Sequence, residues 1–300
     1  MGGIADGVTP NDISMQTLLA SLGTAQTEIY LPAGEYLFHE PIVLPGNTTL
    51  KGESSDLTKL KFDLSSEDHL IKVQGSGLTT VGMLDADGKK DSTNFSITNL
   101  TGFAPGDFIR IFSNDSNMVH NNWAVGSTGQ LLEVKTVLGD RIGVNHPLSR
   151  DYQTADMAFI KKINPIQNVG IESLTIWRED STSIQTSNIK FKHAFNCWVK
   201  CVESYNCNFS HVEIAKSSHV TVTGSHFEDG FSHGSGGKAY GTLLHMGSNN
   251  NLIYDNTFNY LRHSVLLQAG ANTNVISYNF SENPYWTDVA LPANAAGDLV

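Results

Sequence analysis

The first sixty residues combine one helical pattern with several short strand patterns. Apolar residues recur at three- and four-residue spacing in DISMQTLLASL (12–22), which predicts a single amphipathic helix. EIYLPAGEYLF (28–38) and IVLPGNTTLKGE (42–53) place strand-like residues on both sides of proline-containing turns. We therefore expect a capping helix and the first strands within residues 1–60.

The middle of the chain has the pattern of β-hairpins. Apolar and polar residues alternate in GDFIRIF (106–112) and in LLEVKTVLGDRIGVNHPL (131–148), and Gly139-Asp140 fits a tight turn within the second segment. A polar linker (113–129) separates the two segments. Together they predict a β-hairpin insertion over residues 100–163.

Loose repeats begin near residue 165 and predict regular coils over residues 165–300. Their starts lie 22 to 33 residues apart, in the range of the coils of a parallel β-solenoid, where no repeat can bury its apolar face alone. Asn251 and Asn256 recur as Asn274 and Asn279, which predicts ladders of stacked asparagine side chains. The five repeats are NVGIESLTI (168–176), NCWVKCVESY (196–205), SHVTVTGSHF (218–227), NLIYDNTF (251–258) and NVISYNF (274–280).

Composition agrees with a single all-β domain over residues 1–300. Charged residues make up only 16% of the chain, while glycine, asparagine, serine and threonine are abundant, which favours short strands and turns over long surface helices. A net charge of −11 argues against nucleic acid as a partner. No apolar run is long enough to span a membrane.

The three cysteines lie close together in strand-like sequence. Cys197 and Cys201 are too far apart for a disulfide if the chain is extended, and we expect Cys197, Cys201 and Cys207 to be buried thiols. Zinc is the alternative, with His193 or His211 as a fourth ligand, although the spacing matches no strong zinc motif.

The N-terminal segment ADGVTPN…MQTLLASLG…EIYLPAGEYLF…PIVLPGNTTLKGE (5–53) resembles the opening of the pectate-lyase-like right-handed β-helix superfamily. The predicted insertion and the later repeats also look like features of that superfamily. The resemblance implies a right-handed parallel β-helix with an N-terminal capping helix. It also implies activity on polysaccharides, since the superfamily contains lyases, glycoside hydrolases, epimerases and phage tailspikes.

The stretch NTFNYLRHSVLLQAGANTNVISYN (256–279) is similar in layout to a catalytic coil of pectate lyases. The resemblance makes Arg262 the base that abstracts a proton, although the usual proline and second arginine of that motif are missing here. The signature motifs of polygalacturonases and of mannuronan epimerases do not occur. The match therefore favours a lyase over those two classes.

β-Elimination on a polyuronate requires a group that neutralises the carboxylate, a base and an acid. Cationic and proton-transferring side chains gather within residues 226–263, and two or three neighbouring coils could bring them to one groove. We expect Arg262, His263, His245, His233 and Tyr240 to be catalytic. We expect Lys238, Tyr285 and Trp286 to bind substrate, and Trp177 with Arg178 offers a weaker version of the same chemistry.

A structural role is the alternative for each of these residues. Arg262 and His263 could form a surface corner paired with Asp255 or Glu282, His245 could be a structural histidine of a strand, and Lys238 a solvated charge. Tyr240, Tyr285 and Trp286 could pack at the edge of the core.

Acidic residues recur at about one-coil spacing and predict a calcium site. Glu203, Glu228, Asp229 and Asp255 are its candidate ligands, since lyases of this type bind Ca²⁺ with acidic groups from adjacent coils. Acidic residues at turns are also common in structures without metals.

The sequence thus predicts a polysaccharide lyase that cleaves a pectate- or alginate-like polymer by β-elimination. One alternative is a β-helix glycoside hydrolase that uses two carboxylates, with Asp229 and either Asp255 or Glu228 as the pair. Another is a non-catalytic glycan-binding or adhesive β-helix. We expect a secreted, periplasmic or cell-surface location, and we expect coils to continue beyond Val300.

Overall fold

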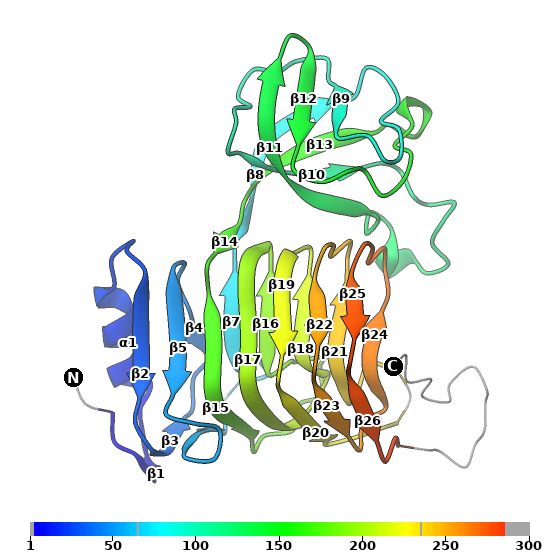
Figure 1. The fold of residues 1–300 in the computed structure, drawn as a ribbon. Helices are drawn as coiled ribbons and strands as arrows, with labels where there is room; N and C mark the ends of the chain where they lie inside the picture. The colour runs from blue at the N-terminus through cyan, green and yellow to red at the C-terminus, as the bar shows by residue number, and fades with distance from the viewer. Residues whose placement is uncertain (1–2, 65, 235, 286–300) are drawn as a thin grey trace.

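The computed structural model is a right-handed parallel β-helix that carries an inserted β-domain (Figure 1). It describes residues 3–64, 66–234 and 236–285. Each coil runs over three faces, so the fold has three corners, named here 1–2, 2–3 and 3–1 after the faces they join. The predicted fold class is confirmed.

Each face is a parallel sheet built from one strand of every coil. The first face contains β2 (Thr27–Leu31), β5 (Thr48–Gly52), the first halves of β15 (Gly170–Arg178) and β17 (Ala194–Cys207), β19 (Ser218–Thr223), β22 (Leu252–Tyr254) and β25 (Val275–Ser277). The second face contains β1 (Asp6–Pro10), β3 (Gly34–Phe38), β6 (Thr58–Phe62), the second halves of β15 and β17, β20 (His226–Gly230), β23 (Thr257–Asn259) and β26 (Phe280–Glu282). The third face contains β4 (Ile42–Val43), β7 (Ile71–Gln74), β16 (Ile189–Lys192), β18 (Ser210–Ala215), β21 (Tyr240–His245) and β24 (His263–Leu267).

The core consists of columns of like side chains. Parallel pairing in register places equivalent residues of successive coils about 4.8 Å apart, so each apolar side chain packs on the next. One column runs along the first face through Ile29, Leu50, Ile171, Val199, Val222, Ile253 and Ile276. On the second face Phe38 stacks on Phe62 with ring centroids 5.3 Å apart, and Phe227 stacks on Phe258 at 5.4 Å. Each such side chain contributes about 1.5–3 kcal/mol by leaving water.

The corners carry the predicted asparagine ladders. At corner 3–1, Asn251 Nδ2 donates to Asn274 Oδ1 at 2.8 Å. At corner 1–2, Asn256 Nδ2 donates to Asn279 Oδ1 at 3.0 Å, and Asn256 Oδ1 accepts from the backbone N–H of Ser225 at 3.1 Å. These amides satisfy backbone groups that the bend removes from the sheet.

The insertion is a six-stranded antiparallel domain, larger than the predicted hairpin. It begins at Ser76 rather than at residue 100, and the bridge between Leu84 and Ile97 joins its edge strands, so that the sheet closes on itself. Its first strand was missed because most of its residues are exposed and lack clear apolar alternation. Gly139-Asp140 does form the predicted turn. The strands are β8 (Ser76–Met83), β9 (Asn94–Ser96), β10 (Phe108–Phe112), β11 (Gly129–Leu138), β12 (Arg141–Val144) and β13 (Phe159–Asn164).

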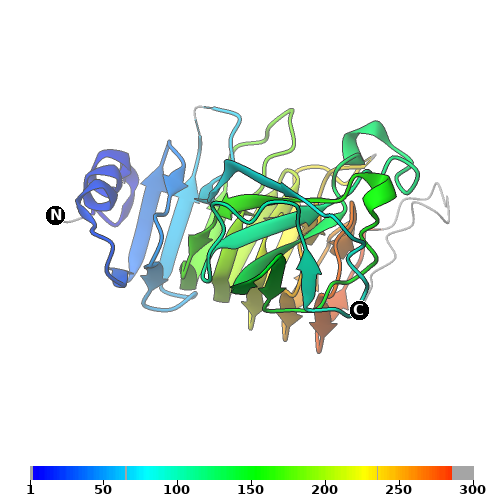
Figure 2. The same cartoon turned by 90° about the horizontal axis from the view of Figure 1, so that it is seen from above.

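The inserted domain packs along corner 3–1 of the solenoid (Figures 1 and 2). The fully buried Arg110 donates from Nη2 to the carbonyl oxygens of Ser127 and Met246, at 3.0 and 2.6 Å, and so joins the two parts. Phe108 of the insertion packs on Phe195 of β17. These contacts set the position of the insertion relative to the coils.

The helix α1 (Asp12–Ser21) matches the predicted segment and covers the N-terminal end of the solenoid (Figure 1). Its Met15 is buried, and Leu18, Leu19 and Leu22 pack partly against the core. Among the described residues, no helix has the length and apolar character needed to cross a membrane.

The cysteines do not all behave as expected. Cys197 and Cys207 are buried free thiols, and burial raises the pKa of Cys197 to about 12. Cys201 is exposed, because it occupies the left-handed position (φ 52°) of corner 1–2, where the chain turns outward. The ring nitrogens of His211 form hydrogen bonds with the Ser204 hydroxyl and the carbonyl of Asp229. The described residues contain no cluster suited to a metal ion.

The asparagine ladder leads to a stability prediction. Asn256→Ala leaves the Ser225 N–H and the Val222 carbonyl without their partner in the core and should lower the free energy of unfolding by about 2–4 kcal/mol. Chemical denaturation followed by circular dichroism measures this loss. Asn259→Ala, on the outer surface of the second face, should cost less than about 1 kcal/mol. Equal losses in the two variants would show that the ladder has no special role.

Candidate functional site

The structure gathers most of the predicted catalytic residues around one loop. Residues 231–239 join β20 to β21 at corner 2–3, and His233, Tyr240 and Arg262 all contact this loop or belong to it. The predicted convergence is therefore present, but the side chains mainly support the loop.

His233 is held by aromatic neighbours. Its ring stacks on Tyr285 with centroids 4.5 Å apart and meets the edge of Tyr260 at 4.9 Å. Its Nε2 donates to the carbonyl of Tyr260 at 2.8 Å. Tyr285 thus offers at most one ring face to a ligand. Trp286, predicted beside it, lies outside the described residues.

Arg262 and Tyr240 anchor the same loop. The Arg262 guanidinium is almost buried and donates from Nη1 to the carbonyl of Gly234, so Arg262 does not lie on a solvated surface corner, the alternative that the sequence left open. The Tyr240 hydroxyl accepts from the N–H of Gly237 at 2.6 Å, and its ring packs on His263 at 5.2 Å. These contacts give Arg262 and Tyr240 a structural role in this conformation.

A polar groove of about 400 Å³ lies between this loop and residues 181–185. Its lining is rich in hydroxyl and amide groups, with Lys238 as its charged side chain and Phe231 as its aromatic one. Hydroxyls, amides and one aromatic ring are the groups that recognise sugars in concave sites. The lining residues are Ser181, Thr182, Ser183, Ile184, Gln185, Asn208, Phe231, Ser232, Gly236, Gly237 and Lys238.

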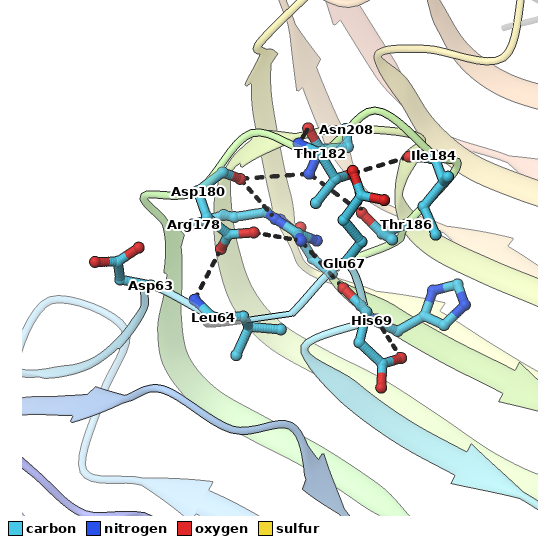
Figure 3. A network of polar contacts seen from close by, with 12 residues as sticks. Asp63, Leu64, Glu67, His69, Arg178, Asp180, Thr182, Ile184, Thr186 and Asn208 are labelled. Atoms are coloured by element: carbon cyan, nitrogen blue, oxygen red, sulfur yellow. Dashed lines mark hydrogen bonds and ion pairs between the residues drawn. The ribbon is translucent and has the colours of Figure 1, made fainter.

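A network around Arg178 fixes the opposite wall of this groove (Figure 3). Arg178 is fully buried and donates to Asp180 Oδ2 at 2.8 Å and to the carbonyl of Asp68 at 3.1 Å. Asn208 Oδ1 accepts from the N–H of Thr182 at 2.9 Å, which ties the wall to the next coil. Arg178 is therefore a structural residue, and the expectation that it binds sugar is wrong.

The outer surface of the second face presents two columns of polar and aromatic side chains. In successive coils, the first column contains Lys59, Thr175, Glu203, His226 and Thr257. The second contains Lys61, Trp177, Tyr205, Glu228 and Asn259. We call these ten residues the second-face surface. Phe231 of the groove follows Glu228 by three residues, so the two features adjoin.

Glu203, Tyr205 and Glu228 form the centre of the second-face surface. The Tyr205 hydroxyl donates to Glu203 Oε2 at 2.8 Å, and Glu228 Oε2 lies 3.0 Å from His226 Nε2. Partial burial and the negative charges of Glu203 and Glu228 raise the pKa of Tyr205, so its hydroxyl stays protonated. Trp177 packs beside Tyr205 with centroids 5.2 Å apart, and Lys59 lies over its ring.

The four carboxylates predicted to bind calcium do not meet. Glu203 and Glu228 share the second-face surface, but Asp229 lies at corner 2–3 and Asp255 at corner 1–2. These two corners are separated by the width of the face, roughly 15 Å. Asp229 with Asp255 is therefore also wrong as a hydrolytic pair. Residues 3–64, 66–234 and 236–285 contain no cluster of three metal-binding side chains.

His245 belongs to a separate polar cluster on the third face. Glu213, with 4% of its side chain exposed, accepts from His245 Nε2 at 3.0 Å and from the Ser187 hydroxyl at 2.8 Å, and pairs with Lys190 Nζ at 3.0 Å. Burial alone would raise the pKa of Glu213, but the His245 hydrogen bond and the charge of Lys190 lower it to about 2. Burial and Lys190 lower the pKa of nearby His69 to about 4. The cluster links four coils.

Sequence reasoning missed several residues of these surfaces. Tyr205 carries no motif, and its position beside Glu203 and Glu228 follows only from the register between β17 and β20. The sequence favours a turn for His226, which the structure places in β20. Glu213 and Lys190 lie in third-face strands that the five repeats did not include. A column-by-column alignment of the repeats would have found both sets.

The Glu213 cluster predicts an acid-dependent loss of stability. A carboxyl whose pKa falls from 4.5 to about 2 on folding stabilises the protein above pH 4.5, and this contribution, about 3 kcal/mol, is lost as the pH falls through 2. Glu213→Gln should therefore be less stable than the wild type at pH 7 and nearly equal to it near pH 2. Denaturant unfolding across this range measures the difference, and a difference that does not vary with pH would contradict the assignment. Glu282→Gln, at an exposed carboxylate, is the control.

The comparisons with known proteins agree with this architecture. The family model described as "Rhamnogalacturonase A/epimerase, pectate lyase-like" matches residues 1–135. No protein with a curated description matches the chain.

Solved structures of phage tailspikes share the fold. The gp49 tailspike of Pseudomonas phage LKA1 is 17% identical over 93% of this chain and 49% of its own, with a TM-score of 0.68. The gp61 tailspike of Pseudomonas phage phi297 is 13% identical over 96% and 52%, with a TM-score of 0.72. The gp54 tailspike of Acinetobacter baumannii bacteriophage AP22 is 13% identical over 95% and 56%, with a TM-score of 0.53. The chain spans about half of the length of these proteins.

At such low identity the likeness concerns the fold. Residues 1–135 are therefore similar to the family described as rhamnogalacturonase A/epimerase, pectate lyase-like, and the chain as a whole shares the right-handed parallel β-helix fold of the tailspikes.

Proposed function

We propose that this β-helix binds an extended polysaccharide on the second-face surface and cleaves it there. The observation that carries the proposal is the pair Glu203 and Glu228, which neighbouring coils present beside Trp177 and Tyr205. The adjoining groove at corner 2–3 extends the contact with hydroxyl and amide groups. A similar tailspike, gp54 of phage AP22, was solved in complex with a capsular saccharide, which agrees with a glycan ligand.

The spacing of the carboxylates favours hydrolysis. Tyr205 and Glu228 are register partners, and Glu203 precedes Tyr205 by two residues on the same strand. This places the Cα atoms of Glu203 and Glu228 roughly 8 Å apart. Inverting glycosidases hold their carboxyl groups about 6.5–9.5 Å apart, which leaves room for the attacking water, and side chains that leave these two positions in the same direction can keep such a separation. One carboxyl would protonate the leaving oxygen while the other accepts a proton from water.

Each carboxylate has hydrogen-bonding partners. His226 Nε2 lies 3.0 Å from Glu228 Oε2. Glu203 accepts from the hydroxyls of Tyr205 and Ser55, the latter at 3.0 Å, which fixes its orientation. Trp177 offers an apolar ring on which a sugar can stack. We propose that one of these two carboxyls acts as the acid and the other as the base.

β-Elimination is the second candidate, and the sequence predicts it. Lys238 in the groove would neutralise a uronate carboxylate, while His245 and His263 lie on the adjoining third face. The two reactions differ in product: hydrolysis creates reducing ends alone, and elimination also creates an unsaturated uronate that absorbs in the ultraviolet. A location outside the cell or at a surface follows from either reaction on such polymers.

Substitution of the carboxylates tests the proposal. Glu203→Gln and Glu228→Gln should each lower the rate of reducing-end release from a cleaved polysaccharide by about 10²–10⁴-fold, because each removes a proton-transfer group. Glycan binding, measured by affinity electrophoresis, should persist in both variants. Glu282→Gln, on the same face two coils beyond Glu228, should keep the wild-type rate. Full activity in both Gln variants would overturn the assignment, and an unsaturated product would favour elimination.

Trp177→Ala tests the binding surface separately. The loss of a stacking ring should weaken glycan binding about three- to tenfold, with little change in the rate at saturation. Titration calorimetry with a slowly cleaved oligosaccharide in the Glu203→Gln background measures this effect. Unchanged affinity would place the glycan elsewhere.

A further inference from the structure

Four cationic side chains and one histidine lie where the inserted domain meets the solenoid. The insertion contributes two of the five and corner 3–1 contributes three. They are Arg110, Lys161, Lys192, His193 and Lys216, and the four that carry charge are named here the corner cations.

Backbone register and side-chain geometry bring the corner cations together. Arg110 and Lys161 are register partners on β10 and β13. Lys192 ends β16, and the N–H of Lys216 donates to the carbonyl of His245 just beyond β18. Arg110 Nη2 donates to the carbonyl of Met246, next to His245, and the register partner of Lys192 is Ala215, which directly precedes Lys216. Burial and then the charges of Arg110, Lys192 and Lys161 lower the pKa of Lys216. The pKa of His193 is lowered to about 4 by burial and by Arg110, Lys216 and Lys192.

None of the five forms an ion pair with a described residue. By contrast, Lys59, Lys61, Lys72 and Lys162 each have a carboxylate within 4.0 Å. The chain has a net charge of −11, so carboxylates are plentiful elsewhere on its surface. Clustering like charges without counterions costs free energy, and an anionic ligand would recover it.

A polar groove of about 700 Å³ adjoins the corner cations. Gln74 in its wall is the register partner of Lys192. Ser76 in the same wall is the register partner of Asn164, which follows Lys161 by three residues on β13. Amide and hydroxyl groups dominate the lining, which consists of Thr24, Gly46, Asn47, Gln74, Gly75, Ser76, Asn164, Pro165, Ile166, Gln167 and Asn168.

We infer that corner 3–1 binds an acidic polysaccharide, with the corner lysines contacting its carboxylates and the groove amides contacting its hydroxyls. The inference rests on the proposed function in one respect, namely that the ligand is a polysaccharide. It adds that this polysaccharide is acidic. It does not depend on cleavage at Glu203 and Glu228. The groove contains no aromatic side chain among its described residues, whereas surfaces for single-stranded nucleic acids stack bases on aromatic rings.

The experiment compares two triple variants of the full chain. Lys161→Gln, Lys192→Gln and Lys216→Gln together remove three corner cations, and Lys90→Gln, Lys135→Gln and Lys200→Gln remove the same charge from exposed sites. Both are assayed in the Glu203→Gln/Glu228→Gln background, which prevents the proposed cleavage, by calorimetric titration with polygalacturonate oligosaccharides. Neutral dextran and a single-stranded oligodeoxynucleotide are the comparison ligands. Thermal unfolding checks each fold, and loss of mutually repelling charges should not lower the Tm of the corner variant.

We expect the background protein to bind polygalacturonate more tightly at low salt than at high salt, and dextran and the oligodeoxynucleotide at least tenfold more weakly. The corner variant should bind polygalacturonate about 10- to 100-fold more weakly with a reduced salt dependence, and the control variant should stay within about threefold of the background. Equal affinity in the two triple variants, or preference for dextran or the oligodeoxynucleotide, would overturn the inference. Cleavage assays on the wild type report on the proposed function independently of these titrations.

Discussion

The parallel in-register stacking of the coils is the constraint on which the rest of this structure depends. A single coil leaves the backbone groups of its three strands unpaired, and only the coils before and after it can satisfy them. Pairing without slippage then forces like residues into columns, as in the run from Ile29 to Ile276. Asn256 and Asn279 extend the same rule to a corner, where side-chain amides replace the sheet. The same register determines which outward-pointing side chains of successive coils become neighbours.

This constraint explains how chemistry is distributed over the molecule. Rigid faces hold side chains at fixed spacing, so Glu203, Tyr205 and Glu228 need little further support. The corners tolerate longer connecting loops, and buried arginines stabilise these loops. Arg178 and Arg262 form hydrogen bonds within the two walls of the groove, and Arg110 bonds the inserted domain to the solenoid. A buried guanidinium can donate to several carbonyls at once, which suits a loop with no sheet of its own. Arg262, which the sequence marks as a catalytic candidate, and Arg178, a candidate for sugar binding, therefore have structural roles in this conformation.

Sequence patterns predicted the architecture well and the site poorly, for one physical reason. Helix α1, the repeats, the Gly139-Asp140 turn and the asparagine ladders depend on local periodicity, which the sequence displays directly. The second-face surface depends on register between coils with irregular spacing, and the link between Glu203 and Glu228 appears only when β17 and β20 are aligned. Proximity in sequence suggested that Glu228 and Asp229 act together, but the left-handed backbone at Asp229 turns it into corner 2–3. The start of the insertion at Ser76 was hidden because β8 is largely exposed.

The negative charge of this protein opposes the binding of an acidic polymer, so such a polymer needs a local site of positive charge. A polyuronate that approached Glu203 and Glu228 alone would be repelled, and the net charge of −11 makes the approach worse. Lys59 and Lys61 precede these carboxylates in the same two columns, but Glu35 and Glu179 already pair with them, so the second face keeps a negative character. Lys161, Lys192 and Lys216, which form no ion pair with a described residue, gather at corner 3–1 beside the inserted domain. An anionic chain would therefore gain its electrostatic attraction at the corner, and this gain would offset the repulsion at the second face.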